Sequence, residues 1–198
     1  MYNKRTFALW DVWYTERDKQ TNGGLFYMDT IVLCGFMSSG KSSIGKRLAK
    51  ALNYAFVDTD QLLIEQSGMT IPQMFEKGGE SYFRDREYET VCSAAKMHRT
   101  VISTGGGTMT FERNAVMLSE NTIVVYIHRD FDRCYEAISR KPDRPLMKNR
   151  TREEVEAIYN SRISAYQKYA HITVDNNGRP DETVKALMEK IKAISSNS

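Results

Sequence analysis

An apolar run, a glycine-rich loop and an amphipathic segment follow one another between residues 31 and 53. The loop reads GFMSSGKS (35–42) and fits the pattern G-x-x-x-x-G-K-[ST]. The run before it, IVLC, predicts a buried strand, and the apolar residues of SSIGKRLAKALN recur at helical spacing. A strand followed by such a loop and then by a helix is typical of α/β proteins, so this unit strongly constrains the fold.

The residues of this loop have the chemistry needed to hold phosphate. Glycine frees the backbone to curve around an anion, so that successive N–H groups point inward, and the helix that starts near Ser42 adds its positive dipole end. Lys41 supplies a cation for the β- and γ-phosphates, and the Ser42 hydroxyl is a ligand for Mg²⁺. The alternative is an accidental glycine-rich turn. We predict a nucleotide-binding site formed by Gly35, Ser38, Ser39, Gly40, Lys41, Ser42 and Ser43.

Apolar, β-rich runs alternate with helical patterns along the rest of the chain. We expect strands at 31–35, 55–57, 101–103, 122–128 and 171–175, and helices at 42–53, 81–97, 131–140, 151–169 and 181–194. The strands are apolar on both faces, as in parallel sheets covered by helices. These patterns predict a three-layer α/β/α sandwich with a five-stranded parallel sheet, in one domain over 29–198. Residues 1–28 lack sustained periodicity and are expected to be a leader or an N-terminal extension of unknown role.

Composition narrows the class of protein further. No apolar run approaches the ~20 residues of a membrane span. The net charge is +3, and the basic residues are scattered, without the block typical of nucleic-acid binding. Cys34, Cys92 and Cys134 have no CxxC spacing, which favours reduced thiols, and Cys34 is expected in the core. We therefore expect a soluble, cytoplasmic protein that binds neither nucleic acid nor membranes.

Two carboxylates follow the second predicted strand. Asp58 and Asp60, in DTD, come where doubly wound sheets place their ligands, beside the phosphate loop. One can face the water shell of a metal ion and the other an acceptor hydroxyl. Taken alone, the pair is equally typical of a turn or a solvated loop end.

The segment IPQMFEKGGESYFRDRE (71–87) combines aromatic and charged residues. Phe75 and Phe83 can wall an apolar ring face, and Arg84 can grip a carboxylate through its two-pronged guanidinium. Glu87, one helical turn further on, can hold that guanidinium in place. The alternative is an exposed ion pair on a helix.

Three successive glycines close the third predicted strand. Gly105, Gly106 and Gly107 would let a ligand touch the main chain, whose N–H groups can bond to its hydroxyls. The alternative is a flexible turn. Beside a phosphate loop and a DxD sequence, we favour the ligand site.

Taken together, the motifs GFMSSGKSSIGKRLA, FVDTD, IPQMFEKGGESYFRDRE, VISTGGG and DRPL, in this order, resemble shikimate kinase. The resemblance runs from about Asp29 to Ile194. Many kinases share the phosphate loop, but the pattern I-x-x-M-F-x-x-x-G-E-x-x-F-R-x-x-E followed by three glycines is far narrower. The resemblance implies a P-loop kinase with a mobile lid, which uses ATP and Mg²⁺ to phosphorylate the 3-hydroxyl of shikimate in chorismate and aromatic amino-acid biosynthesis.

The resemblance also implies roles for single residues. Asp60 would accept or orient the proton of the 3-hydroxyl, with Lys41 and the lid residue Arg144 (lid 141–150) as its catalytic partners, and Asp58 would join Ser42 near Mg²⁺. Arg140, or its neighbour Arg133, and Pro180 would contact adenine. The implied shikimate contacts are Asp60, Phe75, Phe83, Arg84, Gly105, Gly106, Gly107 and Arg162. The resemblance further implies a monomer, and Ser38 departs from the glycine common in the family.

Two other functions remain open from the sequence. A related small-molecule kinase, such as gluconate kinase, would share the phosphate loop. A non-catalytic nucleotide-binding protein could retain the fold, although Lys41, Asp60 and Arg84 are all present.

Overall fold

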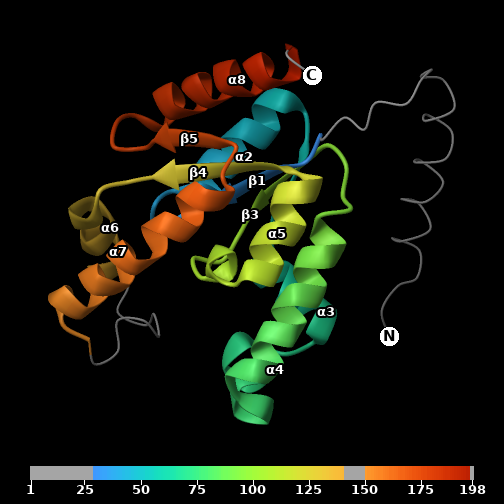
Figure 1. The fold of residues 1–198 in the computed structure, drawn as a ribbon, viewed down its shortest axis with the longest axis vertical. Helices are drawn as coiled ribbons and strands as arrows, with labels where there is room; N and C mark the ends of the chain where they lie inside the picture. The colour runs from blue at the N-terminus through green and yellow to red at the C-terminus, as the bar shows by residue number, and fades with distance from the viewer. Residues whose placement is uncertain (1–28, 141–149, 197–198) are drawn as a thin grey trace, which may run out of the picture.

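A parallel sheet forms the centre of the molecule. The structure, a computed structural model, describes residues 29–140 and 150–196, so the N-terminal segment 1–28 and nearly all of the predicted lid, including Arg144, lie outside the described residues. The strands are β1 (Ile31–Cys34), β2 (Ala55–Asp58), β3 (Thr100–Ser103), β4 (Ile123–His128) and β5 (Ile172–Asp175). They are all parallel in the order β2-β3-β1-β4-β5, which confirms the predicted five-stranded parallel sheet (Figure 1).

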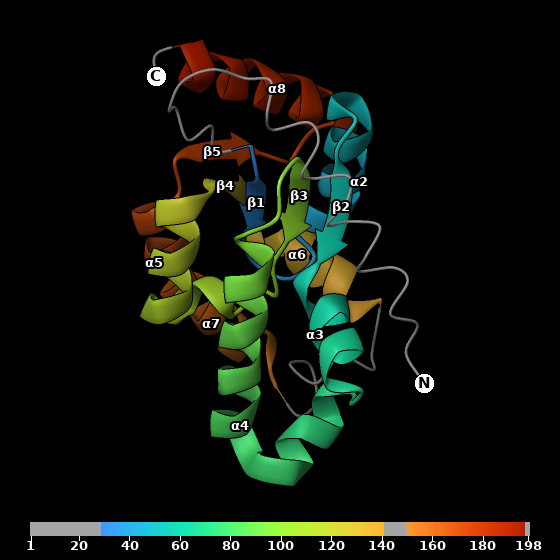
Figure 2. The same cartoon turned by 90° about the vertical axis from the view of Figure 1, so that its right-hand side faces the viewer.

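Helices alternate with these strands along the chain. The helices are α2 (Lys41–Leu52), α3 (Thr59–Ser67), α4 (Ile71–Ala94), α5 (Glu112–Asn121), α6 (Phe131–Ser139), α7 (Arg152–Tyr169) and α8 (Pro180–Ser196), with a 3₁₀ helix η2 (Thr108–Thr110). Figures 1 and 2 show α2 and α8 together on one face of the sheet, while α5 and α7 cover the other. The predicted α/β/α sandwich is therefore confirmed.

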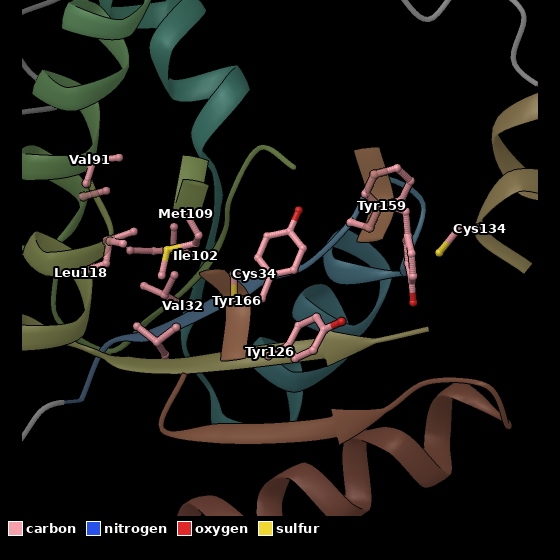
Figure 3. Packing of buried hydrophobic residues seen from close by; sticks show 14 of the residues in the cluster. Val32, Cys34, Val91, Ile102, Met109, Leu118, Tyr126, Cys134, Tyr159 and Tyr166 are labelled. Carbon is pink, nitrogen blue, oxygen red and sulfur yellow. The ribbon is translucent and has the colours of Figure 1, made fainter. Parts of the chain in front are cut away.

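Alternation along β1 builds both apolar layers. Because successive side chains of a strand point to opposite faces, Ile31 and Leu33 pack with α2 and α8, whereas Val32 and Cys34 pack toward α4, α5 and α7. Figure 3 shows both residues in this second layer, with Cys34 near Tyr126 and Tyr166 and Val32 near Ile102 and Leu118. Each fully buried aliphatic side chain here contributes about 1.5–3 kcal/mol relative to exposure. Burial also raises the pKa of Cys34 to about 12, which is consistent with its predicted packing role.

Three helices differ from the sequence-based expectation. Helices α3 and α5 were not among those predicted, and α4 begins at Ile71 rather than near residue 81. In α3 only Thr59 and Leu63 are buried, so its apolar pattern is too short to detect. In α4 the backbone departs from helical angles at Gly78 and Gly79, which interrupts the pattern between its two parts.

The carboxyl ends of the strands gather the predicted site residues. Since the strands are parallel, the loop after β1, the aspartates at the end of β2 and the glycines after β3 share one edge of the sheet. β1 is the central strand of the sheet, so the phosphate loop that follows it lies in the middle of this edge. No helix in the described part of the chain is long and apolar enough to cross a membrane.

Candidate active site

The phosphate loop has the backbone shape that its glycines permit. Gly40 precedes α2 with a φ of +102°, a region that residues with a side chain rarely adopt. A Cβ at this position would also run into the side-chain amide of Asn176. Glycine is therefore required at Gly40 by both the conformation and the close approach. The loop therefore ends directly at the amino end of α2, where the helix dipole is positive and favours an anion.

Lys41 lies folded back over the loop. Its Nζ donates hydrogen bonds to the carbonyl oxygens of Gly35 and Phe36, each at 2.9 Å. Burial lowers the pKa of Lys41 from its ordinary value of 10.5 to about 8, although the carboxylates of Asp60 and Asp58 are among the groups that oppose the shift. A buried ammonium group beside a loop of N–H donors is a site for an anion.

A group of oxygen atoms lies beside the loop. The Ser42 hydroxyl donates to Oδ2 of Asp58 at 3.1 Å, and its oxygen is 3.1 Å from Oγ of Ser103. The sequence analysis did not identify Ser103 as a site residue, because its position before TGGG is the only signal there. Hydroxyl and carboxylate oxygens are the ligands that Mg²⁺ prefers, so Ser42 and Asp58 fit the ion predicted for them.

Asp60 lies against the first glycine after β3. A Cβ built on Gly105 would stand 2.8 Å from Oδ1 of Asp60. The position of Asp60 is fixed by α3, which begins where the Asp58 side chain accepts from the Asp60 N–H at 3.2 Å. The backbone N–H of Gly105 in turn donates to the Thr59 hydroxyl at 3.2 Å.

A cavity of about 370 Å³ connects these groups. Its walls come from the phosphate loop, the start of α2, the end of β2 and the glycine segment after β3. The lining residues are Met37, Ser38, Gly40, Lys41, Ser42, Ser43, Asp58, Asp60, Thr104, Gly105, Gly106 and Ala137. The structure therefore brings the predicted phosphate, metal and proton-accepting residues into one site.

Arg84 is held in place by a buried carboxylate. Its Nη1 lies 2.9 Å from Oε2 of Glu87, whose side chain is only 6% exposed. Glu87 also accepts from the Thr108 hydroxyl at 3.0 Å and from Asn114 Nδ2 at 3.2 Å. The predicted support of Arg84 by Glu87 is confirmed, and it is a buried network rather than an exposed pair. Thr108 and Asn114 were missed, because only the fold brings them to Glu87.

A second arginine reaches the same place from α7. Nη1 of Arg162 donates to the carbonyl oxygen of Gly106 at 3.3 Å, and the Tyr166 hydroxyl donates to the same oxygen at 2.5 Å. A Cβ at Gly107 would lie 3.8 Å from Arg84 Nη1 and 3.9 Å from Arg162 Nη2. Two guanidinium groups thus converge on Gly107, an arrangement suited to a carboxylate.

The aromatic pair lies next to Arg84 rather than in the walls of the cavity. The rings of Phe75 and Phe83 stack with their centroids 4.8 Å apart, and the Arg84 guanidinium lies 4.8 Å from the Phe83 centroid. Phe83 is buried, whereas Phe75 is 40% exposed. The exposed ring of Phe75, stacked on the ring that contacts Arg84, can cover a ligand.

The structure does not bring the predicted adenine contacts to the phosphate cavity. Arg140 pairs with Glu136 at 2.5 Å and lines a separate surface cavity with residues of α6 and Arg152. Pro180 is exposed at the start of α8. The roles of Arg140, Arg133 and Pro180 stay predictions, as does that of Arg144 outside the described residues.

A phosphate loop after the central strand of a parallel sheet, with carboxylates beside it, defines the class as a P-loop kinase fold. The family model for shikimate kinase matches residues 37–192. A shikimate kinase of Enterococcus faecalis is 34% identical over 168 residues, which is 83% of this chain and 99% of that protein. The chain belongs to the shikimate kinase family.

Solved structures of other proteins share the fold of this chain. Shikimate kinase from Acinetobacter baumannii in complex with shikimate superposes with a TM-score of 0.76 at 32% identity, covering 87% of this chain and 96% of that one. A gluconokinase from Sinorhizobium meliloti reaches a TM-score of 0.53 at 16% identity, covering 86% and 95%. The second likeness shows the fold alone.

Proposed function

We propose that this protein transfers the γ-phosphoryl group of ATP to the 3-hydroxyl of shikimate, giving shikimate 3-phosphate and ADP in chorismate and aromatic amino-acid biosynthesis. The observation that carries the proposal is the convergence of Arg84 and Arg162 on Gly107, while Asp60 lies against Gly105 two residues away. A small acid held by its carboxylate at one end would present a hydroxyl to the carboxylate of Asp60 and to the phosphate loop at the other.

The nucleotide would bind through the phosphate loop. The N–H groups from Ser38 to Ser43 would surround the phosphates, and Lys41 would exchange its two backbone carbonyl partners for phosphate oxygens. Arg144 would cover the γ-phosphate from the lid, and Arg140 and Pro180 would contact adenine. These assignments rest on the family.

Ser42 and Asp58 would hold the Mg²⁺ ion that accompanies ATP. The ion would neutralise charge on the β- and γ-phosphates. The chain prepares this position because the Ser42 hydroxyl and an Asp58 oxygen already lie 3.1 Å apart. Their oxygens need to move little to share a cation.

The acceptor would be positioned by contacts at both ends. Arg84 and Arg162 would bind the carboxylate, the main chain from Gly105 to Gly107 would contact the ring hydroxyls, and Phe75 with Phe83 would cover the ring. Asp60 would take the proton of the 3-hydroxyl while the oxygen of that hydroxyl forms a bond to the γ-phosphorus. The bond from that phosphorus to the bridging oxygen then breaks, and ADP leaves with the electron pair.

The proposal extends to the organisation of the chain. Residues 29–198 would form the kinase domain, with a lid at about 141–150 that excludes water when the substrates bind. The enzyme would act as a cytoplasmic monomer on a small-molecule substrate. Residues 1–28 would be a leader or an N-terminal extension of unknown role.

Phosphorus NMR of the product tests the proposed acceptor atom. After reaction with ATP and shikimate, the new phosphate ester signal should couple to the ring proton on carbon 3. Coupling to another ring proton would contradict the assigned hydroxyl. Phosphorylation of gluconate alone would favour the related kinase, and ATP binding without turnover would favour a non-catalytic protein.

A further inference from the structure

Side chains from outside the phosphate loop bind its backbone carbonyl groups. Nη1 of Arg129 donates to the Ser38 carbonyl oxygen at 3.3 Å, and Nδ2 of Asn176 donates to that of Ser39 at 2.7 Å. Lys41 binds the carbonyl oxygens of Gly35 and Phe36, near the start of the loop. When Lys41 turns to a phosphate it leaves its carbonyl partners, so Arg129 and Asn176 remain as supports of the loop.

Ser38 has a backbone conformation that needs support. Its φ is +58°, in the left-handed region that is unfavourable for residues with a Cβ. It is the third residue of a four-residue turn, closed by the Ser39 N–H donating to the Phe36 carbonyl at 3.2 Å. Glycine usually occupies a turn position with positive φ. The bond from Arg129 fixes the peptide plane between Ser38 and Ser39 and so stabilises the turn.

Arg129 is itself firmly anchored at the end of β4. Its carbonyl oxygen accepts from the Tyr159 hydroxyl at 2.9 Å and from Cys134 Sγ at 3.6 Å. The N–H of the next residue, Asp130, donates to Oδ1 of Asn177 at 3.0 Å. A support attached to a rigid part of the sheet can hold a loop in one conformation.

The Arg129 guanidinium is not committed to another charged group. Within residues 29–140 and 150–194 it forms no ion pair, and its Nε is buried without a hydrogen-bond partner. Burying such a donor is unfavourable. Among the described residues, the Ser38 carbonyl is the hydrogen-bond partner of the Arg129 side chain.

We infer that Arg129 is a positioning residue of the ATP site, which holds the Ser38 carbonyl and thereby keeps the loop's N–H groups directed at the phosphates. The inference rests on the proposed binding of ATP by this loop. It assigns a role to a residue that the sequence pattern of the loop does not contain.

Calorimetric titration with ADP tests the inference. Arg129→Met removes the donor but keeps much of the side chain, and we expect the Kd for ADP to rise about tenfold, since that is the effect of one good hydrogen bond. The KM for ATP should rise in parallel, while the KM for shikimate should change less than about twofold. Arg113→Met removes the same charge on α5, where Arg113 pairs with Asp85, and should leave ADP affinity unchanged. Unchanged ADP affinity in Arg129→Met would overturn the inference.

A second substitution separates the support of Ser38 from a direct effect of charge on the nucleotide. Ser38→Gly accepts the left-handed conformation without strain, so in that background Arg129→Met should raise the Kd for ADP only about twofold. An equal loss in both backgrounds would mean that Arg129 acts on the nucleotide itself and would contradict the proposed role.

The readouts keep the two proposals distinct. If the wild-type protein does not bind ADP, the proposed function fails, whereas normal binding that is insensitive to Arg129 overturns only the inference. Should Arg129→Met fail to fold, as judged by its thermal midpoint, Arg129→Lys in both backgrounds makes the same comparison. Lysine keeps a positively charged donor group, so we expect a smaller loss of ADP affinity that Ser38→Gly again suppresses. A loss that Ser38→Gly leaves unchanged would contradict the role.

Discussion

The carboxylate of Asp60 packs directly on Gly105, where a Cβ would stand 2.8 Å from Oδ1. The absence of a side chain at Gly105 therefore sets the position of the proposed catalytic base. The same glycine is bound by the Thr59 hydroxyl through its N–H, so it has little freedom to move away. Because Gly105 contacts the proposed base, the glycine segment is part of the proposed active site rather than only a flexible turn.

Gly105→Ala should lower turnover. The added methyl would displace the Asp60 carboxylate, and a misplacement of about 1 Å can lower the rate about 10²-fold. Measurement of kcat should show that loss, while the Kd for ADP stays near the wild-type value because the phosphate loop is untouched. Wild-type kcat in this variant would show that the position of Asp60 does not limit the reaction.

Asp60→Asn should leave nucleotide binding intact and reduce kcat by about 10²-fold or more, because a neutral amide cannot accept the proton of the hydroxyl. The comparison of kcat with ADP affinity in the same preparation separates catalysis from folding. Turnover at the wild-type rate would remove Asp60 from the proton transfer.

Glu87→Gln should weaken both the fold and the acceptor site. Loss of the charge leaves Arg84 without its buried carboxylate, so the free energy of unfolding should fall by about 1–3 kcal/mol, and the KM for shikimate should rise about tenfold.

The matched control for this substitution lies on the same helix. Glu89 pairs with Arg86 at 2.7 Å and at the same three-residue spacing, but these side chains are 58% and 41% exposed. Glu89→Gln should change the free energy of unfolding by less than about 1 kcal/mol. Equal effects of the two substitutions on denaturant unfolding would contradict the special role of the Glu87 network.

ADP affinity should fall as the pH rises from 7 to 9. In the nucleotide-free protein the pKa of Lys41 is lowered by burial to about 8, so its ammonium group loses its proton over this range, and binding of phosphate then requires proton uptake. Calorimetry in buffers of different ionisation enthalpy should detect that uptake above pH 8. A flat affinity profile with no proton uptake would contradict the lowered pKa.

The lowered pKa of Lys41 affects folding stability in the opposite direction: stability rises with pH, whereas ADP affinity falls. Between about pH 8 and 10.5 the unfolded chain binds more protons at Lys41 than the folded chain does, so Lys41 makes the nucleotide-free protein more stable as the pH rises through this window. Added ADP should reduce that gain, because phosphate favours the charged form.

The parts of the fold that depend on local pattern were predictable from the sequence. The apolar runs place the strands within one or two residues, and the loop pattern with its strand and helix leads directly to the phosphate site. Helix α3 was missed because only Thr59 and Leu63 of its nine residues are buried, which gives no periodic signal. The first part of α4 was missed because Gly78 and Gly79 interrupt the helical pattern inside it.

Contacts between distant segments could not be predicted from single motifs. Arg162 reads as an ordinary helical arginine, and only the resemblance to a family pointed to it before the fold placed its guanidinium on Gly106. Arg129 and Ser38 are 91 positions apart, and neither residue type signals the other. The position of Ser103 beside Ser42 likewise depends on the pairing of β1 with β3.

Phosphorylation of shikimate is tested most directly by measuring ADP release from purified protein with ATP and Mg²⁺, in parallel reactions with shikimate, with gluconate and with no acceptor. The convergence of Arg84, Arg162 and Asp60 on the glycine segment predicts release that depends on shikimate and is lost in Asp60→Asn. Release with gluconate alone, or ATP binding without release in any reaction, would contradict it.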